Sequence, residues 1–301
     1  MKKILFPTDF SPAADHAFIY ALKLAKQIGA EITTLHCYEL PALSGSHLPV
    51  TIRDVYESIS LEEFENYRDN VPHLHEIAQQ AGLESVPLTH IMQEGEAIYN
   101  INKLAGKEAV DLIVMGTTGA SGLKRIFLGS VAAEVMENAP CPVLAIPKDA
   151  QFDGEIDHVA FATEYKDEEI KTLRWLARWP ALKGAEIYCL HVDLYHTEGL
   201  AHKMDLFSKK FEGLDNLHFE VVDHISFEKA ITAYLKEKNI DLLAMVIHHR
   251  NFFKELFNYS YTKELAYHLT TPILAIPERA VNKLNPKPED RRFGLSELSA
   301  L

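Results

Sequence analysis

The stretch Asp111-Leu-Ile-Val-Met-Gly-Thr-Thr-Gly119, followed after nine residues by Gly129-Ser130-Val131, decides the fold of this chain. Its order is that of a buried strand, a glycine-rich loop and the start of a helix. In α/β proteins this order presents backbone N–H groups to a phosphate. Glycine permits a close approach of the backbone, and a serine at the helix start offers a hydroxyl to the same anion. The stretch therefore predicts a loop that holds a phosphorylated ligand.

The chain repeats itself. The segment Gly29-Ala-Glu-Ile-Thr-Thr-Leu-His-Cys37 recurs 155 residues later as Gly184-Ala-Glu-Ile-Tyr-Cys-Leu-His-Val192. Near the end of each copy, Pro142-Val-Leu-Ala-Ile-Pro147 recurs as Pro272-Ile-Leu-Ala-Ile-Pro277. These matches indicate a tandem duplication with a shorter second copy.

Within each copy, short apolar runs alternate with helical patterns, which favours a mainly parallel sheet covered by helices. In the first copy we expect helices over 12–28, 60–81, 95–107 and 130–138, the second of them opened by the capping box Ser60-x-x-Glu63. In the second copy we expect helices over 166–179, 200–211, 226–238 and 260–269. The predicted fold class is two doubly wound, mainly parallel-sheet (Rossmann-like) α/β domains in tandem. Their expected bounds are 1–149 and 150–280, with a C-terminal tail at 281–301. Residues 278–301 are interpreted as an extra tail, which is either frayed or docked on a groove through Leu295, Leu298 and Leu301.

Length, composition and net charge limit the classes of protein to which this chain can belong. The chain has 301 residues, of which 47% are hydrophobic, and its formal net charge is −13. This length suits two domains of about 150 residues. The acidic balance argues against nucleic acid and anionic membrane surfaces as partners. No apolar run is long enough to span a bilayer, and Met1-Lys-Lys-Ile-Leu leads directly into a strand pattern, so we expect a cytoplasmic protein.

The loop spacing resembles the Gly-x2-Gly-x9-Gly-Ser/Thr signature of the universal stress protein family. Two further segments are similar to that family, the first strand and its turn, Lys2-Lys-Ile-Leu-Phe-Pro-Thr-Asp9, and the closing strand Cys141-Pro-Val-Leu-Ala-Ile-Pro147. The resemblance implies a stress-response or regulatory protein that binds ATP in its first copy. It also implies that the closing strands of the two copies pair, which makes one chain an internal pseudo-dimer; a homodimer of whole chains is a further option.

The resemblance also implies site residues. Asp9, after Pro7 and Thr8, and the main chain at Cys37 are expected to hold adenine and ribose. Gly116, after Met115, is expected to contact ribose and the α-phosphate together with Thr118 and Gly119. Gly129, Ser130 and Val131 are expected to hold the β- and γ-phosphates. The family usually has an aliphatic residue where this chain has Cys37.

The second copy departs from this signature. Its counterparts of Gly116, Gly119 and Gly129 are Val246, His249 and Tyr259, and only Ser260 is retained. A branched or aromatic side chain does not readily take the positive φ of such corners. We therefore expect one ATP per chain.

The sequence suggests no dedicated catalysis and no dedicated metal site. It has no Gly-x4-Gly-Lys-Ser/Thr loop and no evident residue to orient an attacking water, so at most slow ATP hydrolysis is expected. Any Mg²⁺ is expected to travel on the phosphates. The pairs His73/His75, His248/His249 and His36/His191 lack the spacing of zinc sites. A slow ATPase and a scaffold that binds no nucleotide stay open as alternatives.

Overall fold

Ten strands of the described residues form one continuous sheet, in the order β3-β2-β1-β4-β5-β10-β9-β6-β7-β8. The computed structural model describes residues 3–40, 51–117, 130–247 and 270–284. The strands are β1 (Lys3–Pro7), β2 (Glu31–Tyr38), β3 (Leu88–Glu94), β4 (Leu112–Gly116), β5 (Val143–Ile146), β6 (His158–Ala162), β7 (Glu186–Asp193), β8 (Leu217–Asp223), β9 (Leu242–Ile247) and β10 (Ile273–Pro277). Strands β1–β5 pair in parallel, and so do β6–β10. The α/β class and the mainly parallel sheet are confirmed.

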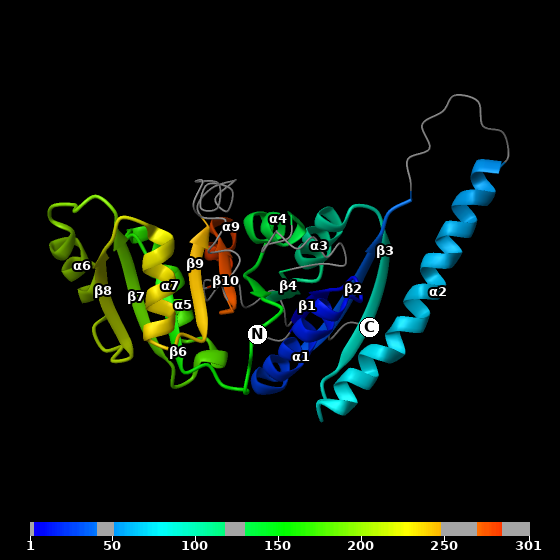
Figure 1. The fold of residues 1–301 in the computed structure, drawn as a ribbon, viewed down its shortest axis with the longest axis horizontal. Helices are drawn as coiled ribbons and strands as arrows, with labels where there is room; N and C mark the ends of the chain where they lie inside the picture. The colour runs from blue at the N-terminus through cyan, green and yellow to red at the C-terminus, as the bar shows by residue number, and fades with distance from the viewer. Residues whose placement is uncertain (1–2, 41–50, 118–129, 248–269, 285–301) are drawn as a thin grey trace, which may run out of the picture.

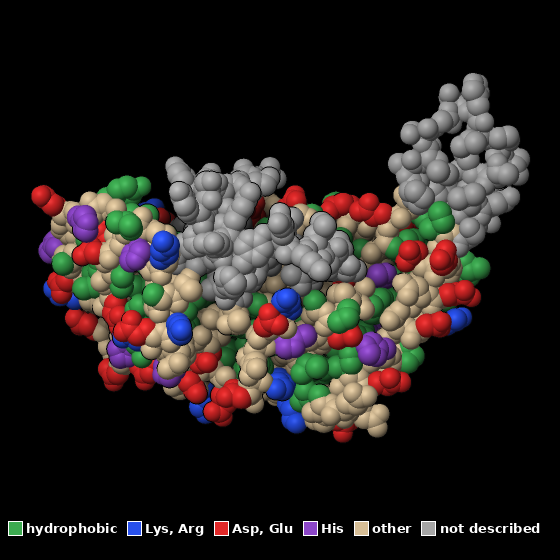
Figure 2. Space-filling view, viewed as in Figure 1, with side chains coloured by type: hydrophobic (Ala, Val, Ile, Leu, Met, Phe, Trp, Pro, Cys, Tyr) green, Lys and Arg blue, Asp and Glu red, His purple; other side chains and the backbone are tan. Residues whose placement is uncertain are grey.

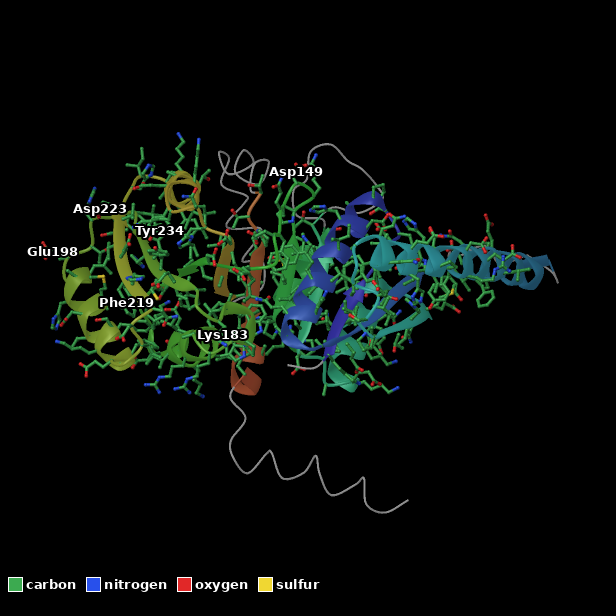
Figure 3. All side chains as sticks on the ribbon, turned by 90° about the horizontal axis from the view of Figure 1, so that it is seen from below. Asp149, Lys183, Glu198, Phe219, Asp223 and Tyr234 are labelled. Carbon is green, nitrogen blue, oxygen red and sulfur yellow. The ribbon has the colours of Figure 1, made fainter. Side chains whose placement is uncertain are left out.

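Helices cover both faces of this sheet. They are α1 (Pro12–Ile28), α2 (Thr51–Gln80), α3 (Ala97–Lys107), α4 (Ser130–Asn138), α5 (Ile170–Leu176), α6 (Leu200–Ser208), α7 (Phe227–Glu237) and α9 (Glu278–Leu284). Buried side chains of α1, α2, α5, α6 and α9 form one core cluster, and those of α3, α4 and α7 form another. Figure 3 labels Phe219, which packs against the first cluster, and Tyr234, which belongs to the second. These two residues lie on opposite sides of the sheet.

The two halves of the chain meet at the centre of the sheet, where β5 and β10 pair antiparallel (Figure 1). Leu144 lies opposite Leu274, and both are fully buried. The strand order outward from this pair is the same in the two halves, closing strand, then fourth, first, second and third. The predicted pairing of the closing strands is thereby confirmed, and both strands lose the open edge that invites aggregation.

A short segment after β5, residues 150–152, packs against helix α1 of the N-terminal half. The Phe152 ring stacks on Tyr20 of α1 with ring centroids 4.2 Å apart. The Ala150 carbonyl oxygen lies 2.5 Å from His16 Nε2, and Lys23 donates to the Phe152 carbonyl. Residues 150–152 are therefore packed onto α1, and Gly154, with φ of 120°, follows this contact.

Local sequence explains both ends of α1 and the start of α7. Ser11 caps α1 by accepting a hydrogen bond from the Ala14 N–H, and Gly29 ends the helix with φ of 66°. Ser226 caps α7 in the same way, accepting from the Lys229 N–H. These three ends follow the ordinary preferences for polar N-caps and for glycine at the C-terminus.

Three predictions about helices are wrong. Helix α2 begins at Thr51, so Ser60 lies inside it and the capping box does not form. The helix expected over 166–179 is a 3₁₀ turn, Asp167–Glu169, followed by the short α5. Residues 278–284 are not an irregular tail but helix α9, whose Ala280 is fully buried. The expected helix over 260–269 lies outside the described residues.

The described part of the chain contains no helix that is both long and apolar enough to cross a membrane. On the face shown in Figure 2, acidic side chains are spread over the surface and the described Lys and Arg side chains occur among them without forming a patch. This distribution agrees with the net charge of −13.

Candidate functional site

The candidate site lies at the carboxyl ends of β1 and β4. These strands are neighbours, and the chain winds outward from them in both directions, through β2 and β3 on one side and β5 on the other. Such a switch point is where open α/β sheets bind ligands. The structure places Pro7, Thr8 and Asp9 at one of these two strand ends and Met115 and Gly116 at the other.

The turn after β1 is held by its own polar groups. The Thr8 N–H donates to Leu35 O at 2.9 Å, and Thr8 Oγ1 accepts from the Phe10 N–H at 3.0 Å. Phe10 takes a left-handed backbone with φ of 56°, which is uncommon for a residue with a side chain. Asp9 is exposed, and its Oδ1 accepts from the Ser11 N–H at 3.1 Å. The turn therefore holds the Asp9 carboxylate at the carboxyl end of the sheet.

His36 supports this turn from the neighbouring strand. Its Nδ1 lies 3.0 Å from Thr8 O, and its ring lies 4.8 Å from the Phe10 ring, between centroids. His36 is buried, and its Nε2 has no hydrogen-bond partner among the described residues, with Glu63 Oε2 at 4.0 Å. Sequence reasoning considered His36 as a strand-end residue and, with His191, as a possible metal ligand, and it missed this role.

Cys37, the next residue of β2, is half-buried at the same end of the sheet. Burial raises the pKa of its thiol to about 11, although a hydrogen bond with the Asn100 side chain opposes that shift. Asn100 is itself buried, and its Nδ2 donates to Glu94 O at 3.0 Å. Asn100 therefore joins the ends of β2 and β3, a role that its place in a helical pattern did not reveal.

At the end of β4, Met115 is buried and Gly116 is half-buried. The Thr117 N–H donates to Ile146 O at 3.0 Å and continues the pairing with β5 by one residue. Thr117 is buried, and sequence reasoning did not single it out. The predicted contacts Thr118, Gly119 and Gly129 lie outside the described residues.

Helix α4 begins at the predicted Ser130, which is exposed, while Val131 is half-buried against the core. Because α4 connects the parallel strands β4 and β5, its N-terminus lies at the carboxyl end of the sheet. A helix start at this position directs N–H groups and a partial positive charge toward a bound anion.

The second half repeats the turn and differs around it. Tyr165 has φ of 55°, Thr163 Oγ1 accepts from its N–H at 2.9 Å, and His191 Nδ1 lies 2.8 Å from Thr163 O. Here a buried carboxylate, Glu169, accepts from the Thr163 hydroxyl at 2.7 Å and from the Lys166 N–H at 3.0 Å. Comparison of the two copies did not point to this carboxylate, because the first half has Ala14 at the matching position.

The end of β9 also differs from the end of β4. Val246, which replaces Gly116, is buried and pairs with Ile276. The other replacements, His249 and Tyr259, and the retained Ser260 lie outside the described residues. Among the described residues, no group of three or more His, Cys, Asp or Glu side chains is arranged to hold a metal ion.

Comparison with known proteins connects this arrangement to one family. The model of the universal stress protein family matches residues 1–147. Universal stress protein MJ0531 of Methanocaldococcus jannaschii is 37% identical over 147 residues, which are 49% of this chain and 82% of that protein. Universal stress protein YxiE of Bacillus subtilis is 31% identical over 144 residues, which are 48% of this chain and 97% of that protein.

A solved structure extends the likeness to both halves. The crystal structure of a universal stress protein from Archaeoglobus fulgidus covers 91% of this chain and 96% of its own, with a TM-score of 0.67 and 22% identity. At that identity the likeness concerns the fold. The sheet of ten strands with two similar halves is therefore an architecture that another member of this family shares.

Proposed function

The chain belongs to the universal stress protein family, and on this premise we propose that its N-terminal half binds ATP in a regulatory, stress-response role. One observation carries the proposal: the fixed Asp9 carboxylate adjoins the strand end that leads into Gly116-x2-Gly119-x9-Gly129-Ser130. A carboxylate suits the hydroxyls of a ribose, and a glycine-rich loop before a helix suits phosphates.

In this proposal, Pro7, Thr8, Asp9 and the Cys37 main chain face the nucleoside. Met115, Gly116, Thr118 and Gly119 contact ribose and the first phosphate, and Gly129, Ser130 and Val131 hold the others. Mg²⁺ travels with the phosphates, because a hard cation prefers oxygen ligands. The domain bounds 1–149, 150–280 and 281–301 and the cytoplasmic location belong to the same proposal, with α9 crossing the last boundary.

The second half is proposed to bind no nucleotide. Val246 fills the position where the first half has Gly116, and its side chain is buried in the sheet. The turn after β6 already satisfies its Thr163 hydroxyl and its Glu164 and Lys166 N–H groups with Glu169. An anion bound at this turn would face the Glu169 carboxylate instead of N–H groups that are free to donate.

The repeat supplies a matched pair of variants that tests this function. Asp9→Asn removes the carboxylate of the proposed site, and Glu164→Gln removes its counterpart in the second half. Loss of a charged hydrogen bond costs about 1.5–3 kcal/mol, so Asp9→Asn is expected to weaken ATP binding by roughly 10- to 100-fold. Glu164→Gln is expected to leave it unchanged, with one ATP per chain in calorimetric titration.

Several results would overturn parts of the proposal. Equal weakening by the two variants, or retained affinity after Gly129→Val, would reject the site. A stoichiometry of two would reject the argument from Val246. Phosphate release by the ATP-saturated protein would favour the slow ATPase. Absence of any ATP binding would favour a scaffold.

A further inference from the structure

Two histidines meet between α2 and β3, away from the candidate site. The C-terminal part of α2 lies along β3 at the outer end of the sheet, with Leu74 and Ile77 buried beneath it (Figure 1). His75 is exposed on this helix, and His90 is half-buried on the strand. Their Nε2 atoms are 3.0 Å apart, with ring centroids at 5.0 Å and ring planes at 73°.

A third residue holds one of the two rings in place. Thr34 is buried on β2 opposite His90 in the strand register, and its Oγ1 lies 2.8 Å from His90 Nδ1. When the hydroxyl accepts from Nδ1–H, the lone pair of His90 is on Nε2, the atom that faces His75. A hydrogen-bonded second nitrogen of this kind is the usual support of a histidine that binds a metal.

The distance between the two nitrogens suits a shared metal ion. Zinc binds histidine nitrogen at about 2.0–2.1 Å, which in tetrahedral geometry separates two nitrogen ligands by about 3.3 Å, so the pair at 3.0 Å needs to open by only a few tenths of an ångström. We propose that His75 and His90 form a site for a divalent transition-metal ion of the zinc type. Because no group of three or more potential protein ligands is gathered among the described residues, water completes the coordination and the ion exchanges.

The chemistry of the pair excludes other cations. Imidazole suits Zn²⁺, Ni²⁺ and Cu²⁺, whereas Mg²⁺ and Ca²⁺ require oxygen ligands. In the metal-free pair, the proton of the hydrogen bond between the rings is on His75 Nε2. On binding, His75 loses this proton to solvent and takes one up at its Nδ1, so that both Nε2 atoms donate a lone pair to the ion. The ion then links α2 directly to the sheet, and this role is independent of ATP.

The neighbouring His73 provides a matched control. It lies two residues before His75 on the same helix and contacts Asp15 Oδ2 at 2.9 Å instead of another histidine. Titration of the full-length protein with Zn²⁺ should show a site that His75→Gln and His90→Gln each weaken at least about tenfold and that His73→Gln leaves intact. Mg²⁺ should produce no heat at this site.

Two further measurements test the arrangement instead of affinity alone. Electron paramagnetic resonance of the Cu²⁺-loaded protein should show coupling to two imidazole nitrogens, reduced to one in His75→Gln. Zn²⁺ should slow hydrogen exchange in residues 74–78 of the wild type and not in His90→Gln. Thr34→Val should weaken Zn²⁺ binding about tenfold, and Thr34→Ser should restore it.

The proposal is wrong if wild-type protein binds no Zn²⁺ at micromolar concentrations. It is also wrong if His73→Gln lowers affinity as much as His75→Gln does. Circular dichroism of each variant shows whether it is folded. If His90→Gln does not fold, the result for His75→Gln decides the proposal, because His75 is exposed. ATP titration of the same variants should be unchanged, so failure here leaves the nucleotide proposal standing.

Discussion

At the scale of single residues, Phe10 and Tyr165 show how far the duplication extends. Both are non-glycine residues in the left-handed region, with φ of 56° and 55°, and each follows a threonine and an acidic residue. Such a backbone costs of order 1 kcal/mol or more and persists only where the surroundings impose it. In both halves the surroundings are the threonine hydroxyl that accepts from the aromatic N–H and a histidine on the next strand.

The sequence identified part of this residue-level detail. Asp9 and Cys37 could be placed because strand ends follow from apolar runs and from the family resemblance. Asn100 and Thr117 could not, because their contacts depend on which strand lies beside which. His36 was accessible in principle, since His191 repeats it 155 residues later together with Thr163. Glu169 has no counterpart in the first half and left no signal.

Cys37 yields a prediction about reactivity. Its thiol has a pKa of about 11, so in the native protein the thiolate fraction should rise about tenfold per pH unit up to that value. Alkylation of Cys37 by iodoacetamide, followed by peptide mass spectrometry, should accelerate accordingly between pH 8 and about pH 10. A plateau near pH 8 would contradict the burial of the thiol.

Cys141 and Cys189 serve as internal controls in that experiment. Both are buried, and burial raises the pKa of Cys189 well above its ordinary value, so neither should react while the protein is folded. Saturating ATP should slow the reaction of Cys37 alone if its main chain faces the nucleoside. Slowing of all three would instead report a general stabilisation.

At the scale of elements, α2 shows where a local motif loses to its context. Ser60 and Glu63 have the spacing of a capping box, yet the helix extends back to Thr51. Residues 51–59 contain neither glycine nor proline, and once a helix is nucleated each added residue costs little. The preceding helix α1 was predictable because a polar cap and a glycine mark its ends. Helix α9 was not, because its helical character depends on packing against the second half.

The interior position of Ser60 gives a prediction with a definite sign. Ser60→Ala should leave the free energy of unfolding unchanged or raise it by up to about 0.5 kcal/mol, because alanine favours a helix interior more than serine does. Loss of a real N-cap would lower it by about 1 kcal/mol. Ser226→Ala, at the cap of α7, is the matched control and should show that loss in urea denaturation. Equal destabilisation by the two variants would contradict the observed start of α2.

At the scale of the whole molecule, the antiparallel pair β5–β10 joins two similar half-sheets into one sheet. This pairing was predicted from the family resemblance, because the closing strands pair in that family and both copies of this chain keep the strand. The sequence did not predict that Phe152 and Ala150 pack onto α1, because the segment after β5 carries no periodic pattern. The strands join the two halves, and this contact fixes the point at which the chain leaves the first half.

A cut between the halves tests that placement. A protease site inserted at Gly154 lies beyond the packed segment 150–152 and before β6. After cleavage, the two fragments should co-elute in gel filtration, because Leu144, Leu274 and their neighbours keep the central pair buried. As a control, Leu274→Asp should separate the cleaved fragments. Separation of the cleaved protein without that change would show that the linker alone holds the halves together.

The β5–β10 pair also determines how the assembly responds to concentration. A two-chain assembly built on such a pair dissociates when it is diluted, whereas a linker keeps the second half at a high effective concentration near the first. Joining of the halves is then a first-order step, independent of how much protein a cell makes. Every molecule carries the two halves in a fixed one-to-one ratio, so mixed or mismatched assemblies of separate copies do not arise at this contact.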